Sequence, residues 1–270
     1  MDLRNGAETR TGLLLPLAAV LLLALISWAA QISAASSCGD GERLTYALRW
    51  GPVRAGTATL ESLGCAEVNG SETLHFLGTI KTDSVVAVVH DERNTWEGFT
   101  DLGMNRTLLY LRKQEEGGEL NQARVVFNTE KNTATYCKIG HRCRTPIPIR
   151  SDTLDPISCI FWFRNLSRRG VSEARIHVSD GRTAAWVAAK VVGREQVTTP
   201  AGAFTTFKVE ATVERGRGTL SGNETTKLLV WFTDNEERLP VMAQGELVFG
   251  PLIAELINVS RPGPTPLRTG

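Results

Sequence analysis

Two carboxylates beside an apolar segment are the first side chains with the types and spacing for acid–base chemistry. Asp152 and Asp155 lie three residues apart, and Pro156 follows directly. Paired carboxylates can serve as general acid and base in hydrolysis. An aspartate before a proline is also well suited to cap a helix, because its side chain accepts an orphan backbone N–H. We interpret Asp155 as a helix cap and keep Asp152 as a candidate carboxylate.

A second polar group is His90-Asp91-Glu92, which has the side chains to hold a metal ion or polarise water. Neighbouring residues of a strand point to opposite faces, so the three cannot all converge, and a solvated strand end is the favoured interpretation. There is no Gly-x-Ser-x-Gly motif and no cysteine in a matching histidine context. The sequence predicts no catalytic residue, metal or cofactor. Asp91, Glu92 and Asp152 remain the candidates for an enzyme acting on cell-wall or glycan substrates.

The chain has five cysteines. Cys137 and Cys143 lie six positions apart, which favours a disulfide across a loop; the alternative is a metal site with His141, but it lacks a clear fourth ligand. Cys38 and Cys65 form a possible second disulfide. Cys159 lies in an apolar stretch and is expected to be a buried free thiol.

The N-terminal residues have the pattern of a secretory signal. Arg4 and Arg10 precede an apolar run over 13–30, and small residues follow. We predict a signal peptide over 1–35, with an uncleaved membrane anchor as the alternative, and lipidation of Cys38 as a weaker third option. Residues 36–260 are expected to form a single β-rich domain in the periplasm or otherwise exported, and 261–270 a disordered tail. The formal net charge of +1 gives no electrostatic argument for nucleic acid.

Strand patterns dominate this domain. Phe207, Val209, Ala211 and Val213 alternate with polar residues, which is the two-residue period of a strand with one buried face. Similar segments predict about a dozen strands in a large curved antiparallel sheet or half-barrel. The stretch 83–90 is ambiguous between a short helix and a strand. One main helix is predicted from Pro156 to about Ser167, ending before Gly170.

The predicted helix brings together basic and aromatic side chains. Arg164 and Arg168 near its end suit the negative end of the helix dipole, or they would meet an anionic head group. A single helix cannot fill the concave face of a wide sheet, which favours an apolar pocket there. The large aromatic residues are expected in the core, and as candidate ligand-lining residues they are Trp50, Phe76, Phe161, Trp162, Trp186 and Trp231.

Several ordered segments resemble a bacterial exported family known only as domain-of-unknown-function family 3108. They are residues 44–58 (LTYALRWGPVRAGTA), 155–158 (DPIS) with Phe161, Trp162 and Arg164, 197–204 (VTTPAGAF), 230–234 (VWFTD) and 238–241 (RLPV). The resemblance covers about 44–257 and implies an exported, mostly β protein with no assigned catalytic residue. Trp162 and the pair Cys137 and Cys143 depart from the family pattern. The hairpin around 230–241 is also similar to one in periplasmic lipoprotein carriers, whose curved sheet covers an apolar cavity.

Three functions therefore stand as hypotheses. The first is a non-catalytic envelope protein that binds a lipid or a lipoprotein acyl chain in the concave sheet. The second is a structural protein with a fully packed sheet, which pairs with an envelope partner through an edge strand or the arginine-rich helix end. The third is the glycan-acting enzyme named above.

Overall fold

The computed structural model describes residues 41–83, 91–215, 226–247 and 250–261. The chain divides after Ser37 into two units, and all of the described residues belong to the second. The predicted signal segment, residues 84–90 of the ambiguous stretch 83–90 and residues 262–270 of the predicted tail 261–270 lie outside the described residues. No helix among the residues described is long and apolar enough to span a bilayer.

The described residues form one antiparallel sheet of fourteen strands, in the order β8-β7-β6-β5-β4-β3-β2-β1-β14-β13-β12-β11-β10-β9. The first half comprises β1 (Glu42–Trp50), β2 (Val53–Val68), β3 (Ser71–Thr82), β4 (Glu92–Thr100), β5 (Thr107–Glu116), β6 (Glu119–Asn128), β7 (Thr133–Lys138) and β8 (Ile147–Pro148). The second half comprises β9 (Glu173–Ser179), β10 (Ala184–Thr199), β11 (Gly202–Arg215), β12 (Thr226–Thr233), β13 (Pro240–Leu247) and β14 (Gly250–Ser260). The mainly β prediction is confirmed, with two strands more than a dozen.

The two halves are joined by pairing between the first and last strands of the sheet. β1 pairs with β14 from Arg43 opposite Ser260 to Trp50 opposite Leu252. A core cluster lies around this joint, with Leu44, Tyr46 and Leu256 almost fully buried, and the Tyr46 hydroxyl donates to the Pro240 carbonyl oxygen at 2.7 Å. Apolar side chains from both ends of the domain therefore hold the middle of the sheet together.

The hairpin of β10 and β11 is long enough to bend. Its register shifts between Val191 and Gly193, which marks a bulge, and bulges bend the strand that contains them. Beyond the bulge, Val197 and Phe204 pack against the core around the β1–β14 joint, and the Ala201 amide donates to the Leu256 carbonyl oxygen at 3.1 Å. The tip of this hairpin thereby lies against the central strands.

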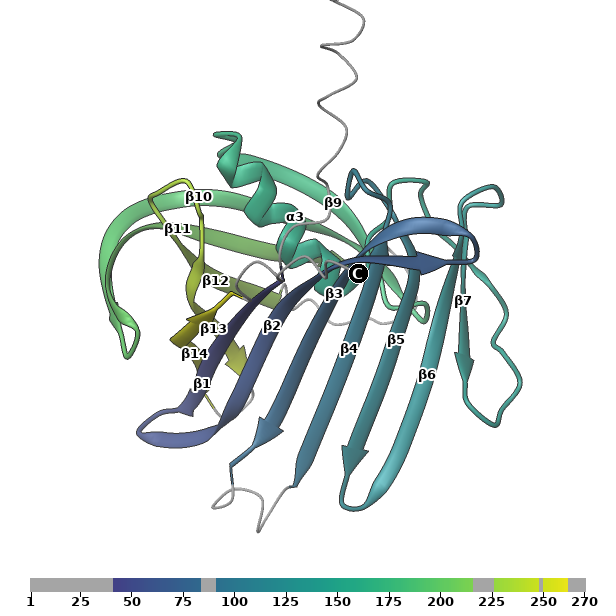
Figure 1. Cartoon of the computed structure of the whole chain (residues 1–270), viewed down its shortest axis with the longest axis horizontal. Helices are drawn as coiled ribbons and strands as arrows, with labels where there is room; N and C mark the ends of the chain where they lie inside the picture. Colours follow the sequence, from purple (N-terminus) through teal and green to yellow (C-terminus); the bar gives the residue numbers. More distant parts are fainter. Residues whose placement is uncertain (1–40, 84–90, 216–225, 248–249, 262–270) are drawn as a thin grey trace, which may run out of the picture. The chain divides into compact units, whose positions relative to one another are not determined.

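One α-helix, α3 (Pro156–Arg168), connects the two halves, and Figure 1 shows it lying within the curve of the sheet. The predicted helix is confirmed within one residue at its C-terminal end. Strand pairing does not close the sheet, but the segment before α3 is bonded to both halves of it. The Thr107 amide, in the first half, donates to the Thr153 carbonyl oxygen, and Leu154 forms a parallel β-bridge with Val178 in the second half. Residues 153–154, which lead into α3, therefore link the two halves of the sheet.

Candidate functional site

The start of α3 is fixed by one buried carboxylate. Asp155 is the N-cap, and its Oδ1 accepts the amides of Ile157 and Ser158, both at 2.9 Å. Its Oδ2 accepts the hydroxyls of Ser158 at 2.6 Å and Thr107 at 2.7 Å. Burial raises the pKa of Asp155, and these hydrogen bonds lower it only in part. The predicted capping role is what the structure shows, and the bond to Thr107 ties the helix start to β5.

Two glycines let α3 approach the sheet closely. A Cβ at Gly98 on β4 would lie 2.6 Å from Asp155 Oδ2 and would also overlap the Ser158 hydroxyl. A Cβ at Gly78 on β3 would lie 2.7 Å from Ile157 Cδ1, the flexible tip of a side chain. The absence of side chains at these two positions sets how near the helix N-terminus lies to β3 and β4.

We expect Gly98→Ala to lower the free energy of unfolding by about 1–3 kcal/mol, the usual range for overpacking. The added methyl group would displace the capping carboxylate, which accepts four hydrogen bonds in its present position. Gly78→Ala is the matched control and should cost less, because the Ile157 tip can rotate away. Urea unfolding of both variants checks this, and an equal or larger loss in Gly78→Ala would contradict it.

One side of α3 packs tightly against the first half of the sheet. Ile157 and Phe161 enter a core cluster with Phe76, Tyr110 and Val125. The Phe76 and Phe161 rings are stacked with their centroids 4.3 Å apart. This side of the helix is therefore filled by large side chains, and the space against β3–β6 is closed.

The other side of α3 faces a cavity of about 550 Å³ above the second half of the sheet. The helix contributes Pro156, Cys159, Ile160 and Phe163 to its lining. The sheet contributes apolar side chains from β10, β11 and β12, all of them small or medium-sized except Phe232: Ala185, Val187, Ala189, Val209, Ala211, Val213, Leu228, Val230 and Phe232. Alanines under the helix, together with Gly245 on β13, leave the volume that larger side chains would occupy.

The alternation of these strands separates an apolar face from a charged face. Residues between the lining positions point to the other side of the sheet, as the two-residue period requires. There, Arg175 pairs with Glu214, and Lys227 Nζ lies 3.6 Å from Glu210. On the cavity side, Leu228 is 39% exposed although it is apolar. The second half of the sheet thus presents an incompletely covered apolar face beneath the helix.

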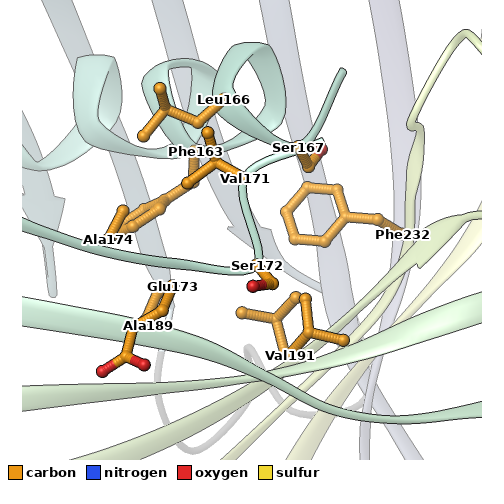
Figure 2. A pocket seen from close by; sticks show the side chains of 11 residues that line it. Phe163, Leu166, Ser167, Val171, Ser172, Glu173, Ala174, Ala189, Val191 and Phe232 are labelled. Atoms are coloured by element: carbon orange, nitrogen blue, oxygen red, sulfur yellow. The ribbon is translucent and has the colours of Figure 1, made fainter. Parts of the chain in front are cut away.

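A smaller pocket of about 30 Å³ adjoins the cavity at the C-terminal end of α3. Figure 2 shows Phe163, Leu166 and Val171 above it and Ala189, Val191 and Phe232 below and beside it. Phe163, Ala189, Val209 and Phe232 line both spaces. The apolar space therefore follows α3 along its length, narrowed by two phenylalanine side chains.

The C-terminal end of α3 is held by an ion-pair cluster rather than open to a head group. The Arg164 guanidinium binds both carboxylate oxygens of Glu42, and its Nε donates to the Glu237 carbonyl oxygen at 3.0 Å. Arg168 donates to the same carbonyl at 2.9 Å and 3.2 Å, and Arg261 pairs with both glutamates. Arg164 and Arg168, the predicted head-group residues, are engaged within the protein here, and neither lines either pocket.

The six aromatic residues predicted as ligand-lining do not line the cavity. Phe76 and Phe161 are in the closed core, Trp231 packs beside the β1–β14 joint, and Trp162 lies in a cluster with Leu154 and Ile176. Trp186 is on the charged face, with the Arg175 guanidinium 4.4 Å from its ring centroid. Trp50 is 44% exposed at the end of β1. Sequence analysis used the alternation on β11 to predict a strand with one buried face, but it did not connect the small side chains on that face with a cavity.

The predicted carboxylates do not form a catalytic pair. Asp152 binds Arg150 at 2.8 Å, near Thr107 and hence near the Thr100 end of β4. Asp91 and Glu92 lie at the opposite end of β4, about 26 Å away at about 3.3 Å per strand residue. Two carboxyl groups of a glycosidase are about 5–9.5 Å apart. The described residues also contain no group of three or more metal-ligating side chains.

The cysteines are distributed as expected within the described chain. Cys137 and Cys143 form a disulfide, so the alternative metal site with His141 is wrong. Cys65 is also disulfide-bonded, and Cys38 lies outside the described residues. Cys159 is a buried free thiol that lines the cavity, and burial raises its pKa.

Comparison with known proteins places this architecture in a family. The model of a protein of unknown function (DUF3108) matches residues 45–257. The chain belongs to the DUF3108 family. No curated protein matches this DUF3108 chain.

Among solved structures, the DUF3108 chain is similar to a β-barrel-like protein of the domain of unknown function DUF1849 from Brucella abortus. The two have 9% sequence identity and a TM-score of 0.56, over 83% of this chain and 98% of that one. A protein with a YmcC-like fold from Bacteroides fragilis gives 12% identity and a TM-score of 0.33, over 83% and 97% of the chains. The Brucella likeness shows a shared fold, and the DUF3108 cavity is described from this chain alone.

Proposed function

We propose that this protein is an exported, non-catalytic protein of the cell envelope that binds an apolar or amphiphilic, lipid-like ligand between α3 and the second half of its sheet. The observation that carries the proposal is the cavity of about 550 Å³ with an almost entirely apolar lining. Pockets of about 300–1,000 Å³ are typical of sites for one small ligand.

The hydrophobic effect supports an apolar occupant. Apolar surface that stays in contact with water is unfavourable by about 25 cal/mol per Å² relative to its buried state. Larger residues in place of Ala185, Ala189 and Ala211 would remove this exposure, yet the chain has small side chains there. A bound hydrocarbon chain would cover the same surface, so the arrangement suits ligand binding better than packing.

Export is supported by the oxidised cysteines. The Cys137–Cys143 disulfide and the bonded Cys65 suit an oxidising compartment such as the periplasm. The predicted signal peptide or anchor at the N-terminus remains a prediction, as does the possible envelope partner. The structural alternative required a fully packed sheet, and the cavity weighs against it. The enzyme alternative is weakened by the separation of Glu92 from Asp152.

Native mass spectrometry of the protein purified from the envelope in which it is produced tests the proposal. We expect mass increments of lipid-like molecules that disappear after organic extraction, and uptake of a fluorescent fatty acid by the extracted protein. Ligand-free protein that takes up no such probe would overturn the proposal.

A cavity-filling substitution gives a sharper result. Ala211 lies on the cavity floor, and Thr212 is the next residue on the same strand with its side chain on the opposite face. We expect Ala211→Phe to lower uptake of a fluorescent fatty acid at least tenfold, because the ring would occupy the ligand's space. Thr212→Phe, the matched control, should bind as the wild type does. Equal binding by Ala211→Phe would place the ligand elsewhere.

A further inference from the structure

We propose that Phe163 and Phe232 form a partition that limits the length of the hydrocarbon chain that the cavity accepts. This inference rests on the proposed function, because it assumes that the cavity binds a hydrocarbon chain. It adds the specificity of the site, since it names the side chains that distinguish a shorter chain from a longer one.

The two phenylalanines lie on the boundary between the two apolar spaces. Phe163 on α3 and Phe232 on β12 line both the cavity of about 550 Å³ and the small pocket of about 30 Å³. The other residues that line both spaces are Ala189 and Val209, whose side chains are smaller. The two rings are therefore the largest side chains between the cavity and the small pocket.

Packing holds both rings in place. Phe163 packs against a cluster on the sheet that contains Val209 and Phe232. The rings of Trp162 and Phe163 meet edge to face, with their centroids 5.0 Å apart. Phe232 is only 3% exposed. The Phe163 side chain therefore extends from the helix to the sheet, and the partition is part of the packed interior.

The space beyond the partition is also largely apolar. Figure 2 shows Leu166, Val171 and Val191 around the small pocket, with the Glu173 carboxylate directed away from it. A hydrocarbon chain that passed the partition would therefore meet further apolar surface. Without the Phe163 ring, the cavity and the small pocket would form one longer space.

Displacement of a fluorescent probe by alcohols of increasing length tests the inference. The even-numbered straight-chain alcohols from octan-1-ol to eicosan-1-ol carry no charge, so the series varies chain length alone. Each would displace N-phenyl-1-naphthylamine from the full chain. Burial of one methylene group increases affinity about fourfold. For the wild type we expect this increase with each added carbon until the chain meets the partition, and no further increase beyond that length.

Phe163→Ala should move this limit to longer chains. A buried phenylalanine side chain is equivalent to about two to four methylene groups in hydrophobic free energy, so we expect a shift of about two to four carbons. Phe163→Leu keeps a side chain at the partition and should give a smaller shift in the same direction. It also changes the packing of α3 less, so it provides the test if Phe163→Ala does not fold.

Val191→Phe distinguishes a partition from a general loosening of α3. Val191 lines the small pocket and not the cavity, so the single variant should have the wild-type limit. In the double variant Phe163→Ala/Val191→Phe, the new ring should occupy the small pocket and return the limit toward the wild-type length. A loosened helix would not be corrected in this way.

The possible outcomes separate this inference from the proposed function. Affinity that rises without a limit in the wild type, or an unchanged limit in the Phe163 variants, would overturn the inference and leave the proposed function standing. A double variant with the same limit as Phe163→Ala would do so too. Failure of the wild type to take up the probe or any of the alcohols would overturn both.

Discussion

Replacing Glu42 with glutamine is expected to lower the free energy of unfolding by about 3 kcal/mol, the largest loss among the substitutions considered. Glu42 and Arg164 are 12% and 9% exposed in their side chains, and the pair joins the start of β1 to the end of α3. Removing one partner of a buried pair leaves the other charge uncompensated, which costs about 3–5 kcal/mol. Urea unfolding followed by tryptophan fluorescence measures this.

Glu214→Gln is the matched control for that experiment. Glu214 also pairs with an arginine, Arg175, but their side chains are 43% and 52% exposed. Exposed pairs contribute about 0–1 kcal/mol, so the control should stay close to the wild type. Comparable losses in the two variants would show that burial of the Glu42–Arg164 pair does not increase its contribution to the free energy of unfolding.

The same pair predicts a dependence on pH. Burial alone raises the pKa of Glu42, but the hydrogen bonds and charges of Arg164 and Arg261 outweigh it and leave the pKa below the ordinary value of 4.5. A carboxylate with a lowered folded-state pKa stabilises the protein above its unfolded-state pKa. That contribution should disappear as the pH falls below about 4.5 through the folded-state value. The difference between the wild type and Glu42→Gln should therefore shrink in acid.

Replacing Asp155 with alanine is expected to lower the free energy of unfolding by about 2–3 kcal/mol. Loss of an N-cap costs up to about 2 kcal/mol, and a buried donor left without a partner costs about 1–3 kcal/mol. The substitution would leave the amides of Ile157 and Ser158 and two hydroxyls without their shared acceptor. Because the raised pKa of Asp155 shows a penalty for burying its charge, we expect the loss to stay below the sum of these contributions.

Hydrogen exchange distinguishes this loss from a general weakening of the fold. The amides of Ile157 and Ser158 should exchange much faster in Asp155→Ala, while amides in the β1–β14 ladder should change only with global stability. Asp152→Ala is the control, because Asp152 is exposed and bonded to Arg150. A loss above about 0.5 kcal/mol in Asp152→Ala, or unchanged exchange at Ile157 in Asp155→Ala, would contradict the capping role.

The parts of this fold that could be predicted from the sequence are those with local causes. Asp155-Pro156 marks the helix start because capping involves neighbouring residues, and the alternation from Phe207 to Val213 marks β11 because a strand repeats every two residues. The disulfide between Cys137 and Cys143 was predictable since a short loop keeps its two ends near one another. These features need no knowledge of the rest of the chain.

The cavity could not be predicted in the same way, because it depends on distances between segments far apart in sequence. The aromatic residues attracted attention as large apolar surfaces, but Phe76 and Phe161 stack against each other and close the space on their side of α3. The opening lies where the side chains are small, as at Ala189 and Ala211. Gly78 and Gly98, which lie in the other half of the domain, let the start of α3 approach β3 and β4 closely.

Arg164 shows that ion-pair partners far apart in the sequence are equally hard to predict. From the sequence its two explanations were the helix dipole and a ligand's head group, because its neighbours offered no carboxylate. Its partner Glu42 is 122 residues away in the chain. The pairing of β1 with β14 brings Glu42 and Arg261 to the same end of the sheet. There, the Glu42 carboxylate binds both Arg164 and Arg261.

The position of β1 and β14 has a consequence for how the chain reaches its native state. Contacts between residues far apart in sequence slow folding, because a long loop must close before they form. Here the ladder at the centre of the sheet needs both the first and the last strand, so it cannot form on a ribosome or a translocating chain until nearly all of the domain has emerged. Until then β1 and β13 would each present an unpaired edge, which invites association with other chains. The β1–β14 ladder is therefore expected to be among the last parts of the domain to form.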